Sequence, residues 1–190
     1  MTENFLEHGL IGRRRFLGLG LGLGAAFALG PAAPALARLR TDSGGRALAF
    51  DNLHTGERVR VTYWENGRYL PDALGEIDQL LRDYRTGDVI GMNTGLLDLL
   101  HTLGHRLGSR KPYQVISGYR SPLTNEALLR AGHDVVENSL HTVGKAIDIR
   151  VADRSLGTVR RAAMGLRRGG VGYYPQLQFV HLDVGRVRHW

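Results

Sequence analysis

The chain contains no cysteine, and only two of its 190 residues, Lys111 and Lys145, are lysines. Without cysteine there are neither disulfides nor thiolate metal ligands, so a metal site must be built from His, Asp or Glu side chains. The other basic residues are arginines spread along the chain, with no dense basic block. The formal net charge is still +7, from 25 basic and 18 acidic residues. This charge indicates an anionic wall polymer or a membrane surface as partner, or a surface merely rich in arginine.

A hydrophobic run long enough to span a membrane is also missing. Residues 19–30 hold about a dozen apolar residues interrupted by glycine, whereas a spanning helix needs about 20. Arginines at 13–15 precede this run and small residues ending at Ala37 follow it, which is the pattern of an export signal. The segment Arg-Arg-Arg-Phe-Leu at 13–17 resembles the twin-arginine signal, with Gly12 in place of the usual Ser or Thr.

We therefore expect a twin-arginine export signal at residues 1–37, a polar linker at 38–46 and a single domain at 47–190 that acts in the periplasm. Removing residues 1–37 takes away three Arg and two Glu, which leaves 22 minus 16, or +6. The expected partners are the twin-arginine export machinery and an anionic wall polymer. Neither nucleic acid nor a stable transmembrane anchor is expected.

Hydrophobic patterning predicts the order of the secondary structure. Strands at 47–53 and 58–64 form a hairpin. One amphipathic helix begins at Pro71, and a second runs from Asn93 to Leu107 and ends at Gly108. The later predictions are a strand at 113–116, a helix at 122–130, a strand at 146–151, a helix at 155–168 and a strand at 179–184. Because strands and helices do not alternate regularly, the expected fold class is α+β, with a mostly antiparallel central sheet and flanking helices.

The segment most indicative of chemistry is Ser-Leu-His-Thr-Val-Gly-Lys-Ala-Ile-Asp-Ile, residues 139–149. Asp148 lies within an apolar strand, and alternation turns its carboxylate away from Ile147 and Ile149. A carboxylate in such surroundings needs a cation nearby, either an arginine or a metal ion. His141, which lies before a glycine-containing turn, is a candidate second metal ligand.

Residues 179–184, Phe-Val-His-Leu-Asp-Val, repeat this alternation. His181 and Asp183 point to the face opposite the apolar residues, so both would look into one site. Two imidazoles and one carboxylate, with a fourth position open, form the ligand set of catalytic rather than structural zinc. The spacing also allows a core without zinc, in which Arg120 forms an ion pair with Asp148.

Taken together, these segments resemble the zinc peptidases of metallopeptidase family 15, which includes the VanX and VanY dipeptidases and carboxypeptidases. Ser-Gly-Tyr-Arg-Ser at 117–121, with Asn125, is similar to the family's substrate-arginine block. The segments 139–148 and 179–183 are similar to its first and last metal blocks. With Gly-Val-Gly-Tyr-Tyr-Pro at 170–175, the blocks look most like those of the family's periplasmic murein endopeptidases.

The resemblance spans about residues 48–190 and implies a fold like that of hedgehog and D-Ala-D-Ala peptidase domains, with one Zn²⁺ per chain. The zinc ligands that it implies are His141, Asp148 and His181. It also implies that Arg120 binds a carboxylate of the peptide near the scissile bond. We assign Ser139 and Tyr119 to the same substrate-binding region.

The chain departs from the family's pattern at the general base. Many relatives carry an acidic residue or a histidine two or three positions before the last metal histidine, where this chain has Phe179 and Gln178. Asp183 is the available carboxylate nearby, either as the base or as an acceptor that orients His181. We prefer the orienting role.

The function predicted from these residues is zinc-dependent hydrolysis of peptide cross-links in peptidoglycan, with stem peptides as substrate and activated water as nucleophile. Two alternatives stay open: a zinc-containing module that binds peptidoglycan without cutting it, and a D,D- or L,D-carboxypeptidase. Elsewhere, Asp98, His101 and His105 have a helical spacing that could hold a metal, and we interpret them as a solvated polar face.

Overall fold

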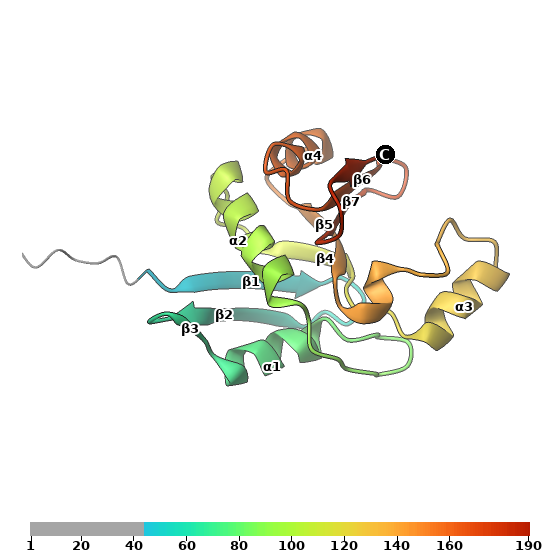
Figure 1. The fold of residues 1–190 in the computed structure, drawn as a ribbon, viewed down its shortest axis with the longest axis horizontal. Helices are drawn as coiled ribbons and strands as arrows, with labels where there is room; N and C mark the ends of the chain where they lie inside the picture. The colour runs from blue at the N-terminus through green and yellow to red at the C-terminus, as the bar shows by residue number, and fades with distance from the viewer. Residues whose placement is uncertain (1–43) are drawn as a thin grey trace, which may run out of the picture. The chain divides into compact units, whose positions relative to one another are not determined.

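The computed structural model describes residues 44–190, so the predicted export signal and most of the predicted linker lie outside the described residues. The helices are α1 (Pro71–Leu80), α2 (Thr94–Leu107), α3 (Pro122–Arg130) and α4 (Leu156–Met164), and a 3-10 turn, η1 (Leu140–Val143), precedes β5 (Figure 1). The strands are β1 (Arg46–Asn52), β2 (Arg58–Glu65), β3 (Arg68–Tyr69), β4 (Tyr113–Ser117), β5 (Ala146–Val151), β6 (Gly170–Tyr174), β7 (Phe179–Asp183) and β8 (Arg188–His189). None of the helices between residues 44 and 190 has the length and apolar character needed to cross a bilayer.

All eight strands belong to one sheet, in the order β3-β2-β1-β4-β5-β7-β6-β8. Neighbouring strands are antiparallel except for β1 beside β4 and β6 beside β8, which are parallel. The predicted α+β class with a mostly antiparallel sheet is therefore confirmed.

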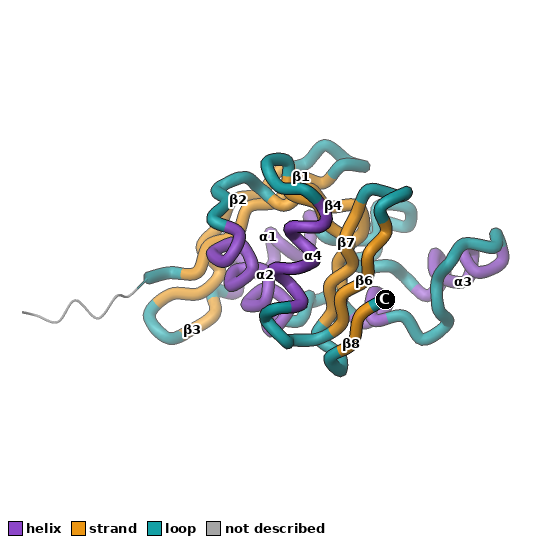
Figure 2. The backbone as a smooth tube through the Cα atoms, turned by 90° about the horizontal axis from the view of Figure 1, so that it is seen from above, coloured by secondary structure: helices purple, strands orange, loops and turns teal. Residues whose placement is uncertain are grey.

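The hydrophobic core lies on one face of this sheet. In Figure 2, α1, α2 and α4 lie within the curve of the strands, whereas α3 lies apart from them. Ile147 and Ile149 of β5 are fully buried on the helical side, as the alternation predicts. They belong to the same core cluster as the buried leucines of α2: Leu96, Leu97, Leu99, Leu100, Leu103 and Leu107. Burying each such side chain stabilises the fold by about 2 kcal/mol before chain entropy is subtracted.

The opposite face of the sheet carries polar side chains in register. Asp51 of β1 is paired with Arg58 of β2 and with Gln114 of β4, and Gln114 is paired in turn with Arg150 of β5. Asp148 lies two residues before Arg150 and therefore faces the same side. The sheet thus separates an apolar core from a polar face that includes the candidate ligands on β5 and β7.

The structure differs from the predicted elements mainly near the C-terminus. Helix α4 ends at Met164 rather than near residue 168, because Arg167 and Gly169 adopt left-handed backbone conformations, with φ of 50° and 86°. Strands β3, β6 and β8 were not predicted. β3 and β8 have two residues each, and β6 contains two glycines, so none shows a periodic apolar pattern.

Candidate metal centre

Two of the predicted ligands face each other across adjacent strands. The antiparallel pairing of β5 with β7 puts Asp148 directly opposite His181. Directly opposite residues have their Cβ atoms about 5 Å apart on the same face, so the side chains meet without any loop being involved. The Oδ1 atom of Asp148 lies 2.8 Å from Nδ1 of His181.

The third predicted ligand, His141, comes from the η1 turn. Ser139 caps this turn by accepting a hydrogen bond from the backbone N–H of His141, at 3.3 Å. The ring Nδ1 lies 2.7 Å from the carbonyl oxygen of Gly118, and since a carbonyl can only accept, Nδ1 carries the proton. Gly118 reaches this position because it has no side chain: a Cβ there would lie 2.5 Å from the carbonyl oxygen of Leu81.

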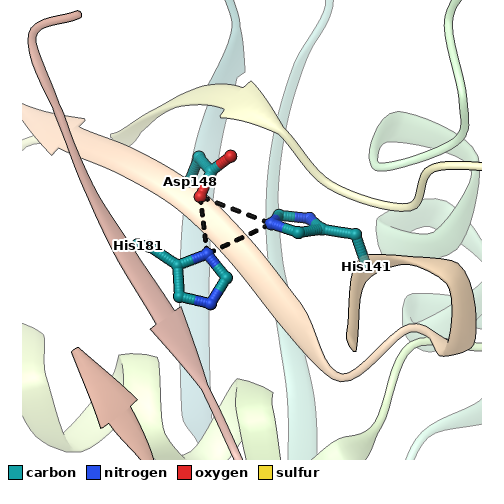
Figure 3. A group of neighbouring side chains, drawn as sticks. All are labelled: His141, Asp148 and His181. Atoms are coloured by element: carbon teal, nitrogen blue, oxygen red, sulfur yellow. Dashed lines mark hydrogen bonds and ion pairs between the residues drawn. The ribbon is translucent and has the colours of Figure 1, made fainter. Parts of the chain in front are cut away.

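With Nδ1 protonated, the free Nε2 of His141 points at the other two residues (Figure 3). It lies 3.2 Å from Nδ1 of His181 and 3.4 Å from Oδ1 of Asp148. The ligand atoms of all three residues lie within 4.8 Å of one another, and both His141 and Asp148 are buried. Two imidazole nitrogens and one carboxylate oxygen thus converge on a single point, which is the donor set of a catalytic zinc site.

The cluster favours positive charge at its centre. Burial raises the pKa of the Asp148 carboxyl, but the imidazoles of His141 and His181 outweigh burial and hold this pKa below its ordinary value. Burial lowers the pKa of His181, but hydrogen bonds to Asp148 and Asp183 raise it to about 9. A divalent cation at the same point would take the place of the proton.

Asp183 lies behind His181 and is fully buried. Its Oδ1 accepts hydrogen bonds from the backbone N–H groups of Gly170 at 3.0 Å and Gly185 at 2.7 Å. Its Oδ2 accepts from Arg188 at 2.7 Å and lies 3.2 Å from Nε2 of His181. Burial raises the pKa of Asp183, but these hydrogen bonds outweigh it and lower the pKa. Asp183 is therefore an ionised acceptor that orients the His181 ring, with few lone pairs left for substrate.

Arg120 presents an incompletely paired guanidinium. Its side chain is buried, and one terminal nitrogen donates to Oδ1 of Asn125 at 3.2 Å, while its Nε has no partner. The amide of Asn125 is held in that orientation because its Nδ2 donates to the carbonyls of Val136 and Glu137. Burial lowers the pKa of Arg120, although it remains a cation. A buried guanidinium with an unused donor is suited to binding a carboxylate.

The alternative ion pair between Arg120 and Asp148 does not form. Between residues 44 and 190, the ion pairs of Asp148 are with His141 and His181. Among the described residues, the charge of Asp148 is therefore not balanced by an arginine.

A cleft of about 660 Å³ contains the three candidate ligands and Arg120. Ser139 also lines it, so this residue both caps the turn that carries His141 and faces the cleft. Tyr119 lies elsewhere: its ring is buried in the hydrophobic core and its backbone N–H donates to the carbonyl of Leu81. The predicted contact of Tyr119 with substrate has no support in this geometry, because the neighbouring Arg120 takes the side of the chain that faces the cleft.

The two residues at the predicted position of the base differ in where they lie. Phe179 lines the cleft, where its ring stacks on Tyr174 with 4.7 Å between ring centroids. Gln178 has a left-handed φ of 59° and donates its side-chain amide to the carbonyl of Pro175, within its own turn. Gln178 is therefore not a candidate base.

Comparison with known proteins identifies the family of the chain. Residues 40–190 match the peptidase family described as "Peptidoglycan L,D-endopeptidase MepK". The chain belongs to this family. This confirms the resemblance to metallopeptidase family 15 that the motif blocks predicted.

Several curated relatives carry the same description. The protein named "Peptidoglycan L,D-endopeptidase MepK" from Escherichia coli K12 is 41% identical over 178 residues, which is 94% of this chain and 96% of the relative. The protein named "Probable peptidoglycan L,D-endopeptidase MepK" from Haemophilus influenzae Rd is 42% identical over 146 residues, or 76% of this chain and 78% of the relative. No solved structure matched the chain.

One wall of the cleft was missed by the sequence analysis. Trp190 lines the cleft with its ring centroid 5.4 Å from that of His181, and its indole N–H donates to the hydroxyl of Tyr174 at 2.8 Å. Arg188 lies over the Trp190 ring at 4.9 Å. Gly172 makes room for this ring, since a Cβ there would lie 2.8 Å from it. A glycine inside a strand, beside two tyrosines, was the signal that could have indicated this close packing.

A second polar cluster lies around Asp98. Its carboxylate accepts hydrogen bonds from the hydroxyls of Tyr63 and Tyr69, both at 2.8 Å, and forms an ion pair with Arg46 at 2.7 Å. The two histidines predicted with it contact each other rather than Asp98. The interpretation of Asp98 as part of a solvated face was therefore wrong, because only 17% of its side chain is exposed.

Proposed function

We propose that the chain is a zinc-dependent endopeptidase that hydrolyses an amide in L,D cross-links between peptidoglycan stem peptides. The observation that carries this proposal is the convergence of His141, Asp148 and His181 in the same cleft as the incompletely paired guanidinium of Arg120. The printed names of the relatives support the choice of substrate and bond.

The residues present fit a zinc ion. The ligand atoms are those that zinc prefers, and each imidazole is held from behind, His141 by the carbonyl of Gly118 and His181 by Asp183. Zinc bound there would supply Lewis acidity, which activates water and polarises the carbonyl of the scissile amide.

The chain's own side chains supply the remaining functions. Arg120 binds a carboxylate of the stem peptide and so fixes the scissile amide relative to the metal ligands. Asp183 keeps the Nε2–H of His181 pointing away from the cleft, which leaves Nδ1 facing the metal position. Phe179 and Trp190 provide apolar walls that exclude water from part of the cleft.

The test is digestion of purified peptidoglycan by residues 38–190, with and without zinc chelation, beside a His181→Ala variant. We expect cross-linked dimers to disappear only with the zinc-loaded, intact protein, and mass analysis of the products to identify an L,D bond. Release of terminal D-alanine with the dimers intact would instead support the carboxypeptidase. Stoichiometric zinc without any product would overturn the catalytic proposal in favour of the binding module.

We further propose that the protein reaches the periplasm by the twin-arginine route. The support is the Arg13–Arg14 pair ahead of a short apolar run in the sequence. Replacing both arginines with lysine keeps the charge but should retain the precursor in the cytoplasm, as read by cell fractionation. Unchanged periplasmic yield of the doubly substituted chain would contradict this route.

A further inference from the structure

The face of the sheet opposite the helices carries a basic trough that the metal centre does not use. Two hollows lie along it, of about 700 and 550 Å³, and both are lined by Gln114. The first also contains Arg150, and the second contains Arg58, Arg60 and Lys111. The two hollows share Gln114 and Ala152 and are therefore adjacent on this face.

The trough is strongly unbalanced in charge. The side chains that line the two hollows include five basic residues: Arg58, Arg60, Lys111, Arg150 and Arg154. Of these, Arg154 forms an ion pair with Asp153 at 3.1 Å. The single acidic residue among the lining residues is Asp51, which lies 3.6 Å from Arg58. Arg60 and Lys111 are exposed, and within residues 44–190 neither forms an ion pair. Unpaired cations grouped along one hollow attract anionic groups over a distance of about one Debye length.

The trough begins beside the metal centre on the same face of the sheet. Arg150 lies two residues from Asp148 on the same face of β5, and its Nε donates to Gln114 at 2.8 Å on the next strand. From β5 across β4 and β1 to β2 there are three strand spacings, or about 14 Å, which is the length of about four extended residues. A chain held at the metal centre could therefore continue across this face, because the helices α1, α2 and α4 cover the opposite one (Figure 2).

We infer that this trough, formed by Arg58, Arg60, Lys111, Gln114 and Arg150, binds a carboxylate-bearing stem peptide next to the cross-link being cut. The inference rests on the proposed function, and it concerns binding to the polymer rather than hydrolysis. Charge complementarity supports this occupant, because the carboxylates of such a peptide would lie against the unpaired cations of the trough. The trough would then hold the protein on intact peptidoglycan, whereas a small soluble dimer would need only the cleft.

The test compares residues 38–190 with the triple variant Arg58→Gln, Arg60→Gln, Lys111→Gln. The matched control, Arg161→Gln, Arg167→Gln, Arg168→Gln, removes the same charge from exposed positions in and after α4. Binding to intact sacculi is measured by sedimentation over a range of salt concentrations, and cleavage is measured on both sacculi and an isolated cross-linked dimer. Thermal melts establish that both variants are folded.

We expect the trough variant to bind sacculi about tenfold more weakly, because it loses three contacts worth about twofold each. Its binding should also depend less steeply on salt concentration. Its cleavage of the dimer should match that of the control and the parent chain. Equal binding of sacculi by all three proteins would overturn the inference, and so would binding of anionic lipid vesicles in preference to sacculi. If the parent chain cleaves neither substrate, the proposed hydrolysis fails, while the sedimentation result still decides the inference about the trough.

Discussion

The carboxylates of Asp98 and Asp148 lie in polar clusters that differ in the groups surrounding them. Asp98 is surrounded by donors from other parts of the chain: the hydroxyls of Tyr63 and Tyr69 and the guanidinium of Arg46. Asp148 faces two imidazoles, and each of these rings has a nitrogen of the kind that can bind a metal ion. The charge of Asp98 is therefore balanced within the chain, whereas that of Asp148 is balanced only when a proton or a metal ion is added.

We interpret the Asp98 cluster as structural and the Asp148 cluster as the place where a cation would bind. A buried carboxylate with a full set of donors stabilises the fold and has little capacity left for a ligand. A buried carboxylate grouped with other acceptors is costly unless a cation is bound among them. Binding of a cation at that site therefore stabilises the folded protein. Four substitutions test this contrast, from the largest expected effect to the smallest.

The largest effect should come from Asp148→Asn, which keeps the shape of the side chain but removes its charge. We expect zinc content to fall from about one per chain to near zero, as read by elemental analysis. Cleavage of cross-linked peptides should fall by more than the ~10–100-fold that loss of an outer partner costs. The control is Asp98→Asn, a variant that should bind zinc as the parent chain does. A full equivalent of zinc in the Asp148 variant would remove this residue from the ligand set.

Arg120→Gln should lower kcat/KM for cross-linked peptide by about 10–100-fold. The reason is the loss of charge-assisted hydrogen bonds to a substrate carboxylate, which are worth about 1.5–3 kcal/mol. Zinc content should not change, because Arg120 forms no ion pair with the ligands among the described residues. Arg120→Lys should recover part of the activity. Zinc loss in parallel with activity would show that the residue maintains the metal centre instead.

Asp183→Asn separates its two candidate roles. If Asp183 orients His181, zinc affinity should fall by about tenfold in a chelator competition, and activity should largely return once zinc is saturating. If it is the general base, zinc affinity should be retained while kcat falls and the acidic limb of the pH–rate profile is lost. The contacts in the structure favour the first result, because five hydrogen-bonding contacts already surround its oxygens.

The smallest effect on function should come from Asp98→Asn, which should leave cleavage unchanged. It should lower the free energy of unfolding by about 1–2 kcal/mol at neutral pH, or the melting temperature by roughly 3–6 °C. Burial raises the pKa of Asp98, but the hydrogen bonds from Arg46 and the two tyrosines outweigh it and lower the pKa below its ordinary 3.8. The stabilisation is thus present above pH 3.8 and is lost as the pH falls through the lower folded value. Melts of both proteins at decreasing pH should therefore converge, and a constant difference would contradict this linkage.

The sequence was sufficient to predict the parts of the site that depend on strand alternation. Asp148 and His181 meet because each lies on the polar face of an apolar strand, and that face can be assigned from a period of two. The position of Tyr119 and the donors to Asp98 could not be predicted in this way. Both depend on which loop packs against which helix, and such contacts between distant segments leave no periodic pattern.

The C-terminal wall was missed for a related reason. Its strand, β8, has two residues and no hydrophobic repeat, and it forms because β6 offers an edge for pairing. Arg188 then donates to Asp183, which in turn contacts His181. The ring of Trp190 lies directly against the ring of His181. Pairing at a sheet edge depends on the whole fold, so the local sequence around residues 188–190 does not predict it.

The close packing of Gly170 and Gly172 against the last residues links positions that are nearly twenty apart in the sequence. A Cβ at Gly170 would lie 2.4 Å from Asp183 and 2.7 Å from Arg188, and one at Gly172 would lie 2.8 Å from Trp190. In evolutionary terms, a side chain at either glycine requires a compensating change in the residue that it would meet. Relatives with a side chain at the position of Gly172 should also have lost the large ring at the position of Trp190, so the pair should appear as a coupled substitution in an alignment of the family.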